Sequence, residues 1–302
     1  MIRIAIGVYG LSDWFAGDLA PVVELATIAD RAGVDMISIT DHVVMGEATD
    51  KYPYGRFPSP PDYPWFEPLT FLATVAGATR DIRLGTAVVI APLRPAVLLA
   101  KQAATLDMLS RGRLDLGVGV GWQKEEYDAT GMPFEQRYRI LDETMRACRV
   151  LWSEAPARFH GEFVNFDGIY SKPFPQQERL PLWFGLAPTP KNCARIAELG
   201  DGWIPIVQDP AVIKRGVAAL RDAFAARGRV PASLEVRAVP KYVFGSDQSP
   251  DLEATLAQLP ALLDAGTTVI ELHPRVFCRG PDEFEAFVER LVALKHSTRN
   301  RS

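Results

Sequence analysis

Cysteine and histidine are both scarce in this sequence of 302 residues, which contains three cysteines and four histidines. The cysteines, Cys148, Cys193 and Cys278, are far apart, and none belongs to a C-x-x-C pair. A disulfide framework or a structural zinc site needs closely spaced, paired ligands. The cysteine pattern therefore argues against both and suits a reducing compartment.

Long apolar runs and an excess of charge of one sign are also lacking. No stretch approaches the roughly 20 apolar residues of a membrane span, and the first apolar run is too short for a signal peptide. Lys and Arg number 33 against 37 Asp and Glu, so the net charge is −4. Such a chain has no overall attraction for nucleic acid or anionic lipid. We expect a cytoplasmic protein that binds neither membrane nor nucleic acid.

Short β-branched runs alternate with helical periods along the whole chain. The pattern predicts strands at residues 2–8, 36–40, 82–90, 114–118, 182–185, 202–206, 236–244 and 268–273. It predicts helices at residues 22–29, 69–79, 95–110, 141–152, 190–199, 213–224, 252–263 and 284–291. The segment 155–180, rich in Gly, Pro and scattered aromatic residues, interrupts the alternation and is interpreted as an inserted hairpin or loop.

Eight strand–helix units are the number that a (β/α)₈ TIM barrel requires. The sequence therefore predicts an α/β protein in which residues 1–302 form one barrel domain with an insertion at 155–180. A doubly wound parallel sheet is the alternative, although the uniform repetition and the length favour the barrel.

The active site of a barrel lies at the carboxyl ends of its strands, where this chain carries Asp41 and His42 after the second predicted strand. Imidazole titrates near neutral pH, so His42 could give or take a proton during a reaction, with Asp41 beside it. The alternative is that Asp41 braces a loop and that His42 is a buried, hydrogen-bonded side chain.

A catalytic metal is the competing chemical hypothesis for these strand ends. His42 and His273 both follow predicted strands, and Asp41 or Glu271 could contribute a ligand. However, no H-x-H, H-x-x-E-H or H-E-x-x-H pattern occurs, so we expect no metal site.

Glycines after the fourth predicted strand form a second candidate site. Gly117, Gly119 and Gly121 lack the last glycine of a G-x-G-x-x-G fingerprint. They fit either a tight turn or a close approach of backbone to a phosphate or flat ring. Thr189-Pro190 begins a predicted helix, whose free amides could cap the helix or hold an anion.

Three stretches carry a resemblance to a known family: residues 39–42 (Ile-Thr-Asp-His), residues 82–88 and residues 109–122. Together they resemble the bacterial luciferase-like monooxygenase superfamily, and within it the branch of oxidoreductases that depend on the deazaflavin coenzyme F420. The similarity covers almost the whole chain.

The resemblance implies a barrel with an inserted segment, a homodimer, and a flavin or deazaflavin across the strand ends. It implies a non-prolyl cis peptide bond at Ala87–Val88 against the cofactor ring. It also implies that two turns hold the cofactor, namely Gly119-Val120-Gly121 and Gly185-Leu186-Ala187.

The leading functional hypothesis is hydride transfer between F420 and a small organic substrate, with His42 handling the accompanying proton. The aromatic loop at residues 52–66 favours an apolar or flat substrate. One alternative is a monooxygenase that uses O₂ and reduced flavin mononucleotide (FMNH₂) from a separate reductase. A further alternative is a barrel that binds a flavin-like ligand without catalysis.

Overall fold

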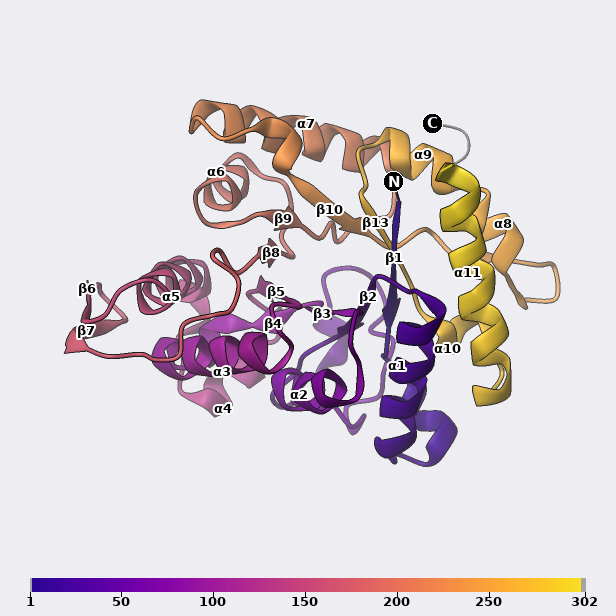
Figure 1. Cartoon of the computed structure of the whole chain (residues 1–302), viewed down its shortest axis with the longest axis horizontal. Coiled ribbons are helices and arrows are strands. Elements are labelled where there is room, and N and C mark those ends of the chain that lie inside the picture. The colour runs from indigo at the N-terminus through magenta and orange to yellow at the C-terminus, as the bar shows by residue number, and fades with distance from the viewer. Residues whose placement is uncertain (1, 300–302) are drawn as a thin grey trace.

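Eight parallel strands close into a barrel in the computed structural model, which describes residues 2–299 and the side chains of residues 2–295 (Figure 1). The strands are β1 (Arg3–Gly7), β2 (Met36–Ile39), β3 (Arg83–Thr86), β5 (Leu114–Gly119), β8 (Leu182–Phe184), β9 (Gly202–Trp203), β10 (Glu235–Ala238) and β13 (Val269–Leu272). They follow the order β3-β2-β1-β13-β10-β9-β8-β5, and pairing of β3 with β5 closes the ring. Closure confirms the predicted barrel and excludes the doubly wound sheet.

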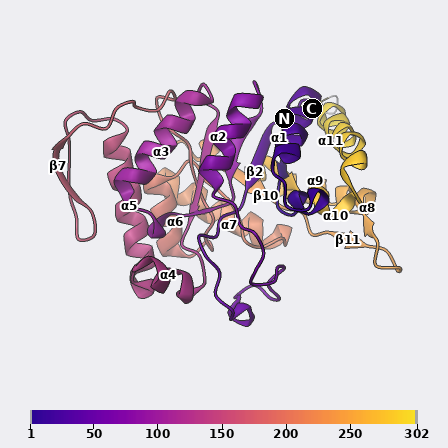
Figure 2. The same ribbon diagram turned by 90° about the horizontal axis from the view of Figure 1, so that it is seen from below.

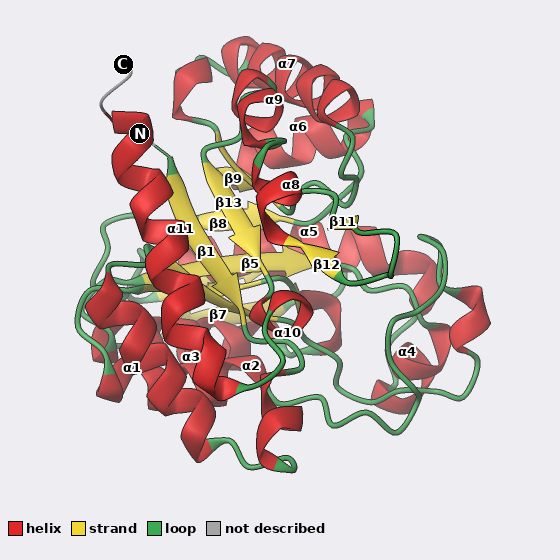
Figure 3. Ribbon diagram, turned by 90° about the vertical axis from the view of Figure 1, so that its right-hand side faces the viewer, coloured by secondary structure: helices red, strands yellow, loops and turns green. Residues whose placement is uncertain are grey.

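Helices surround the strands on the outside of the barrel (Figure 3). They are α1 (Ala20–Ala32), α2 (Pro68–Ala78), α3 (Ala96–Leu109), α4 (Lys124–Thr130), α5 (Arg137–Leu151), α6 (Pro190–Leu199), α7 (Pro210–Ala226), α8 (Leu252–Leu256), α9 (Leu259–Asp264), α10 (Pro274–Phe277) and α11 (Phe284–Arg299). Glu67 caps α2 by accepting the Thr70 N–H, and Gly33 ends α1 in the left-handed conformation. Within residues 2–299, no helix is both long and apolar enough to cross a bilayer.

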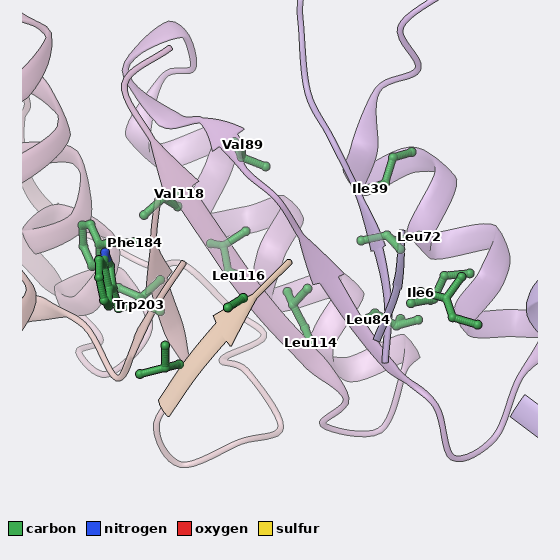
Figure 4. Packing of buried hydrophobic residues seen from close by; sticks show 14 of the residues in the cluster. Ile6, Ile39, Leu72, Leu84, Val89, Leu114, Leu116, Val118, Phe184 and Trp203 are labelled. Atoms are coloured by element: carbon green, nitrogen blue, oxygen red, sulfur yellow. The ribbon is translucent and has the colours of Figure 1, made fainter. Parts of the chain in front are cut away.

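The main core lies between the strands and the helices. Figure 4 shows Leu72 of α2 beside Leu84 and Ile6 of the neighbouring strands, and all three side chains are fully buried. The barrel interior holds a smaller cluster of Ala5, Met36, Trp183 and Val269. Buried polar side chains also lie in that interior, so the inside of the barrel contains hydrogen-bonding groups as well as apolar packing.

Three predicted strands are much shorter in the structure than their apolar runs suggested, and one of them, predicted at 202–206, is only the two residues of β9. The run at 82–90 is interrupted by a cis peptide bond between Ala87 and Val88, after which β4 (Val89–Ile90) continues beside β5. The run at 236–244 leaves the barrel after Ala238, before Pro240, which has no N–H to donate. Beyond it, β11 (Val243–Phe244) forms a ribbon with β12 (Pro250–Asp251).

The helical prediction also needs two corrections. The predicted helix at 252–263 is divided into α8 and α9, because Pro260 occupies the first turn of α9 and cannot continue the hydrogen bonding of α8. The short helices α4 and α10 were not predicted, because seven and four residues carry little apolar periodicity.

The segment 155–180 contains a hairpin of β6 (Ala157–His160) and β7 (Asn165–Ile169), which Figure 2 shows projecting at the edge of the molecule. The long loop between β2 and α2 extends elsewhere, on the same side as α4 (Figure 2). That loop and α4 both contribute residues to the candidate site.

Candidate active site

His42 lies just beyond the carboxyl end of β2, where its imidazole meets a carboxylate from α4. Nδ1 of His42 is 3.3 Å from Oε2 of Glu126, whose side chain is fully buried. The other oxygen of Glu126 accepts the N–H of Val43 at 2.6 Å. A carboxylate fixed in this way orients the imidazole.

Glu126 is a residue that sequence reasoning did not assign to the site. It lies 84 positions from His42 along the chain, on a helix that the sequence did not predict. The only available signal was its place shortly after the fourth predicted strand, a property it shares with Glu125. Glu125 instead points outward to Lys51 at 3.2 Å.

Aromatic rings enclose the His42 imidazole. Its ring centroid is 5.7 Å from Phe57, 4.7 Å from Trp65 and 6.3 Å from Trp122, with edge-to-face geometry in each case. Tyr52 packs on both Phe57 and Trp122, and burial raises the pKa of its phenol, which therefore stays neutral. We call Tyr52, Phe57, Trp65 and Trp122 the aromatic wall.

Two donors in the aromatic wall are buried without a partner. The indole N–H groups of Trp65 and Trp122 have no hydrogen-bond acceptor within the described part of the chain. Most buried polar groups in folded proteins are satisfied, so these two donors lack a partner that the described chain supplies.

Cavities adjoin this wall. The loop that follows β2 lines a partly open pocket of about 790 Å³ with residues 49, 50 and 55–60, and Phe57 belongs to both its lining and the aromatic wall. A smaller cavity at the ends of β1 and β2 is lined by Tyr9, Thr40 and Trp65 among others. The larger volume lies within the range of about 300–1,000 Å³ that is usual for small-molecule sites.

The carboxylate of Asp41 is fully engaged in structural contacts. Its side chain is 1% exposed and forms a two-point ion pair with Arg94, at 2.6 and 3.0 Å. One of its oxygens also accepts the N–H of Ile90 at 2.8 Å. These contacts fit a positioning role, in which Asp41 ties the end of β2 to β4, better than a role in proton transfer.

The predicted cofactor residues come together around Val88. The structure has the cis peptide bond that the resemblance implied, at Ala87–Val88, and both residues are partly exposed at the barrel mouth. A Cβ added to Gly119 would lie 2.6 Å from Val88 Cγ2, and one added to Gly185 would lie 2.9 Å from Val88 Cγ1. The two glycines therefore leave room for the Val88 side chain.

The remaining predicted cofactor residues are placed nearby, with backbone groups partly engaged. Gly121 has φ of 61° and packs against Ile90, while the Val120 carbonyl accepts the Tyr127 hydroxyl at 2.6 Å. Leu186 is buried in the core, and Ala187 is exposed just before the α6 cap, at which Thr189 accepts the Asn192 N–H. Their role in cofactor binding stays a prediction.

A family model described as luciferase-like monooxygenase matches residues 6–276. The chain belongs to the luciferase-like monooxygenase family. The sequence resemblance is thereby confirmed, and it places the protein in a family of oxidoreductases and monooxygenases.

Curated relatives in this family include proteins of different description. An uncharacterized protein of Mycobacterium tuberculosis is 37% identical over 231 residues, covering 75% of each chain. An FMNH₂-dependent dimethylsulfone monooxygenase of Pseudomonas putida is 28% identical over 246 residues, covering 80% of this chain and 62% of the relative.

Solved structures with this fold include a monooxygenase and an F420-dependent dehydrogenase. The monooxygenase RslO1 of Streptomyces bottropensis matches with a TM-score of 0.75 at 22% identity and covers 100% of both chains. An F420-dependent secondary alcohol dehydrogenase matches with a TM-score of 0.73 at 17% identity, over 96% of this chain and 97% of the other. At these identities the likeness establishes the fold alone.

Proposed function

We propose that this luciferase-like protein is an F420-dependent oxidoreductase that acts on a small, largely apolar organic substrate. The observation that carries the proposal is the His42–Glu126 pair inside the aromatic wall, at the strand ends where barrel enzymes hold their substrates. Hydride transfer to or from a carbon bearing oxygen requires a proton at that oxygen. A carboxylate-backed imidazole is suited to give or take it.

The residues around His42 fit a flavin-type cofactor. The unpartnered indole N–H groups of Trp65 and Trp122 match the carbonyl acceptors of such a ring system. The residues that would hold it are Ala87, Val88, Gly119, Val120, Gly121, Gly185, Leu186 and Ala187. When bound, the deazaflavin supplies or accepts the hydride.

This chain's own residues handle the proton and exclude water. Glu126 fixes the orientation of the His42 ring. Asp41, paired with Arg94, accepts the Ile90 N–H and so holds the neighbouring backbone in place. The aromatic wall lowers the local polarity, which strengthens the interaction of His42 with a substrate oxygen.

Oxygen insertion with FMNH₂ is the second candidate. The Pseudomonas putida relative is described as FMNH₂-dependent, and the aromatic wall would shield a reactive intermediate from water. In that reaction His42 would need only to donate a hydrogen bond. A separate reductase would then supply the reduced flavin.

Calorimetric titration of the purified protein with F420 and with FMN, in the oxidised and reduced forms, separates the candidates. We expect micromolar or tighter binding of F420 and weaker binding of FMN. The reverse order supports the monooxygenase. Binding of neither cofactor would overturn both enzymatic proposals.

Variants at His42 test the proton-transfer role with a panel of secondary alcohols and ketones, following the cofactor absorbance. His42→Ala should lower turnover by ~10²–10⁴-fold and leave cofactor affinity unchanged. His42→Asn should be nearly as slow in hydride transfer but milder in a monooxygenase. His160→Ala, in the exposed hairpin, is the matched control. If His42→Ala keeps more than about a tenth of the wild-type rate with chemistry rate-limiting, His42 is not the proton-transfer group.

A further inference from the structure

A second polar cluster lies at the barrel mouth, built on β13 and the segment after β10. The hydroxyl of Tyr242 is 2.6 Å from Nδ1 of His273. Nε2 of His273 is 3.5 Å from Oε1 of Glu271, and Oε2 of Glu271 is 3.2 Å from Nε of the buried Arg237. None of these four residues contributes to the His42 site described above.

The imidazole of His273 occupies space left by a glycine inside the barrel. A Cβ on Gly7 would lie 2.4 Å from Cδ2 and 2.5 Å from Nε2 of His273. Nε2 therefore faces the interior end of β1. The His273 side chain is 21% exposed, so part of the imidazole lies open to solvent.

A buried hydroxyl without a partner lies beside that position. Ser38 of β2 pairs in register with Gly7 of β1, and paired residues of adjacent parallel strands point to the same face. Ser38 is 1% exposed, and its Oγ has no hydrogen-bond partner among the residues described. Ser38 and the His273 imidazole therefore both lie beside Gly7 on the interior side of β1.

The protonation of this cluster can be assigned from its contacts. Burial lowers the pKa of His273 and outweighs Glu271, which raises it, so the imidazole is neutral near pH 7. Burial also raises the pKa of Tyr242, so the phenol keeps its proton and donates to Nδ1. The imidazole proton then resides on Nε2, which at 3.5 Å from Oε1 of Glu271 makes no hydrogen bond to that carboxylate.

The cluster carries no net charge that would attract an ion. Arg237 pairs with Glu271, and it also donates to the Thr86 carbonyl at 2.6 Å. His273 and Tyr242 are neutral. A ligand here meets two neutral donors, and an anion would have to approach the Glu271 carboxylate.

We propose that His273 Nε2–H and the Ser38 hydroxyl form a binding subsite for a neutral carbonyl or hydroxyl oxygen. The inference rests on the proposed function, since it places a second oxygen-binding point in the same mouth as His42. β2 and β13 each pair with β1, so the strand ends that lead to His42 and His273 are two inter-strand spacings, about 10 Å, apart. That oxygen belongs either to the substrate or to a ring carbonyl of the cofactor.

Histidine NMR tests the subsite directly, because the chain has only four histidines. Protein labelled with ¹³C-histidine is titrated with cyclohexanone, and the His273 signal is assigned with His273→Gln. We expect a saturable shift of the His273 Cε1–H signal with cyclohexanone and none with methylenecyclohexane, which has the same shape without oxygen. The His160 signal should not move.

Two variants test the geometry. Ser38→Ala should weaken cyclohexanone binding about 2–10-fold, the range for loss of one hydrogen bond. Tyr242→Phe removes the donor to Nδ1, so the imidazole proton can move to that nitrogen, and binding should weaken similarly. Tyr170→Phe, on the exposed hairpin side, is the control.

The same titration with F420 or FMN identifies the source of the oxygen. If cyclohexanone still shifts the His273 signal with cofactor bound, the oxygen is the substrate's. If cofactor alone shifts the signal and abolishes the cyclohexanone response, the oxygen is the cofactor's. No saturable shift in any arm, or unchanged affinity in Ser38→Ala, overturns the subsite. Binding of cyclohexanone by a protein that binds neither cofactor would overturn the proposed function and leave the subsite standing.

Discussion

A methyl group added at Gly119 should collide with Val88, and the size of the effect can be worked from the structure. The added Cβ would lie 2.6 Å from Val88 Cγ2. Two carbon atoms in contact prefer about 3.5–4.0 Å, so Gly119→Ala forces a displacement of about 1 Å at the barrel mouth.

Overpacking of this kind costs about 1–3 kcal/mol, and alanine recovers about 0.5–1 kcal/mol relative to glycine in a strand. We therefore expect Gly119→Ala to lower the free energy of unfolding by about 1–2 kcal/mol. For a protein of this size, the melting temperature should fall by about 2–4 °C per kcal/mol. Gly185→Ala should cost less, because its added Cβ would lie 2.9 Å from Val88 Cγ1.

The assay is a double-mutant cycle in urea. Val88→Ala removes both γ carbons, so Gly119→Ala should cost little or nothing in the Val88→Ala background. Gly117→Ala is the matched control, because its Cβ would lie 2.0 Å from the backbone oxygen of Thr86. That clash should persist in both backgrounds.

Additive effects of Gly119→Ala and Val88→Ala would refute the argument that glycine is needed at 119 to accommodate Val88. A different reason for the glycine would then apply, such as close approach of a cofactor. In that case Gly119→Ala should lower F420 affinity equally in both backgrounds while stability changes little.

Three further outcomes are expected. Asp41→Ala removes the two-point ion pair of the buried Arg94 guanidinium and leaves only Glu67, at 3.2 Å, as its counter-ion. We expect a loss near the lower end of about 3–5 kcal/mol in urea denaturation, with Asp41→Ala/Arg94→Leu recovering part of it. Glu126→Gln should slow turnover at least about tenfold, part of the ~10²–10⁴-fold that a positioned acid–base group supplies, with cofactor affinity measured as the control. Burial lowers the pKa of His273 in the folded protein, so as pH falls the unfolded chain binds a proton at this imidazole before the folded chain does. The wild type should therefore lose stability relative to His273→Gln as pH falls below about 6.5. A difference independent of pH between 8 and 5 would contradict that assignment.

The sequence by itself determined the alternation of strands and helices, the closed barrel and the place of His42 at a strand end. These follow from local periodicity and from the rule that parallel strands joined by helices end on one face. Local periodicity failed where proline removed a backbone donor, as at Pro240 and Pro260, and where α4 was too short to show a period.

Only the tertiary structure decided which side chains meet at the barrel mouth. Glu126 reaches His42 because α4 folds back over the end of β2, and Val88 lies against Gly119 and Gly185 because β3 and β4 pair with β5, which pairs with β8. Ser38 and His273 both lie beside Gly7 because β2 and β13 both flank β1. Barrel closure fixes such contacts between distant residues. Sequence spacing encodes only near neighbours, which is why these partners were not predictable from it.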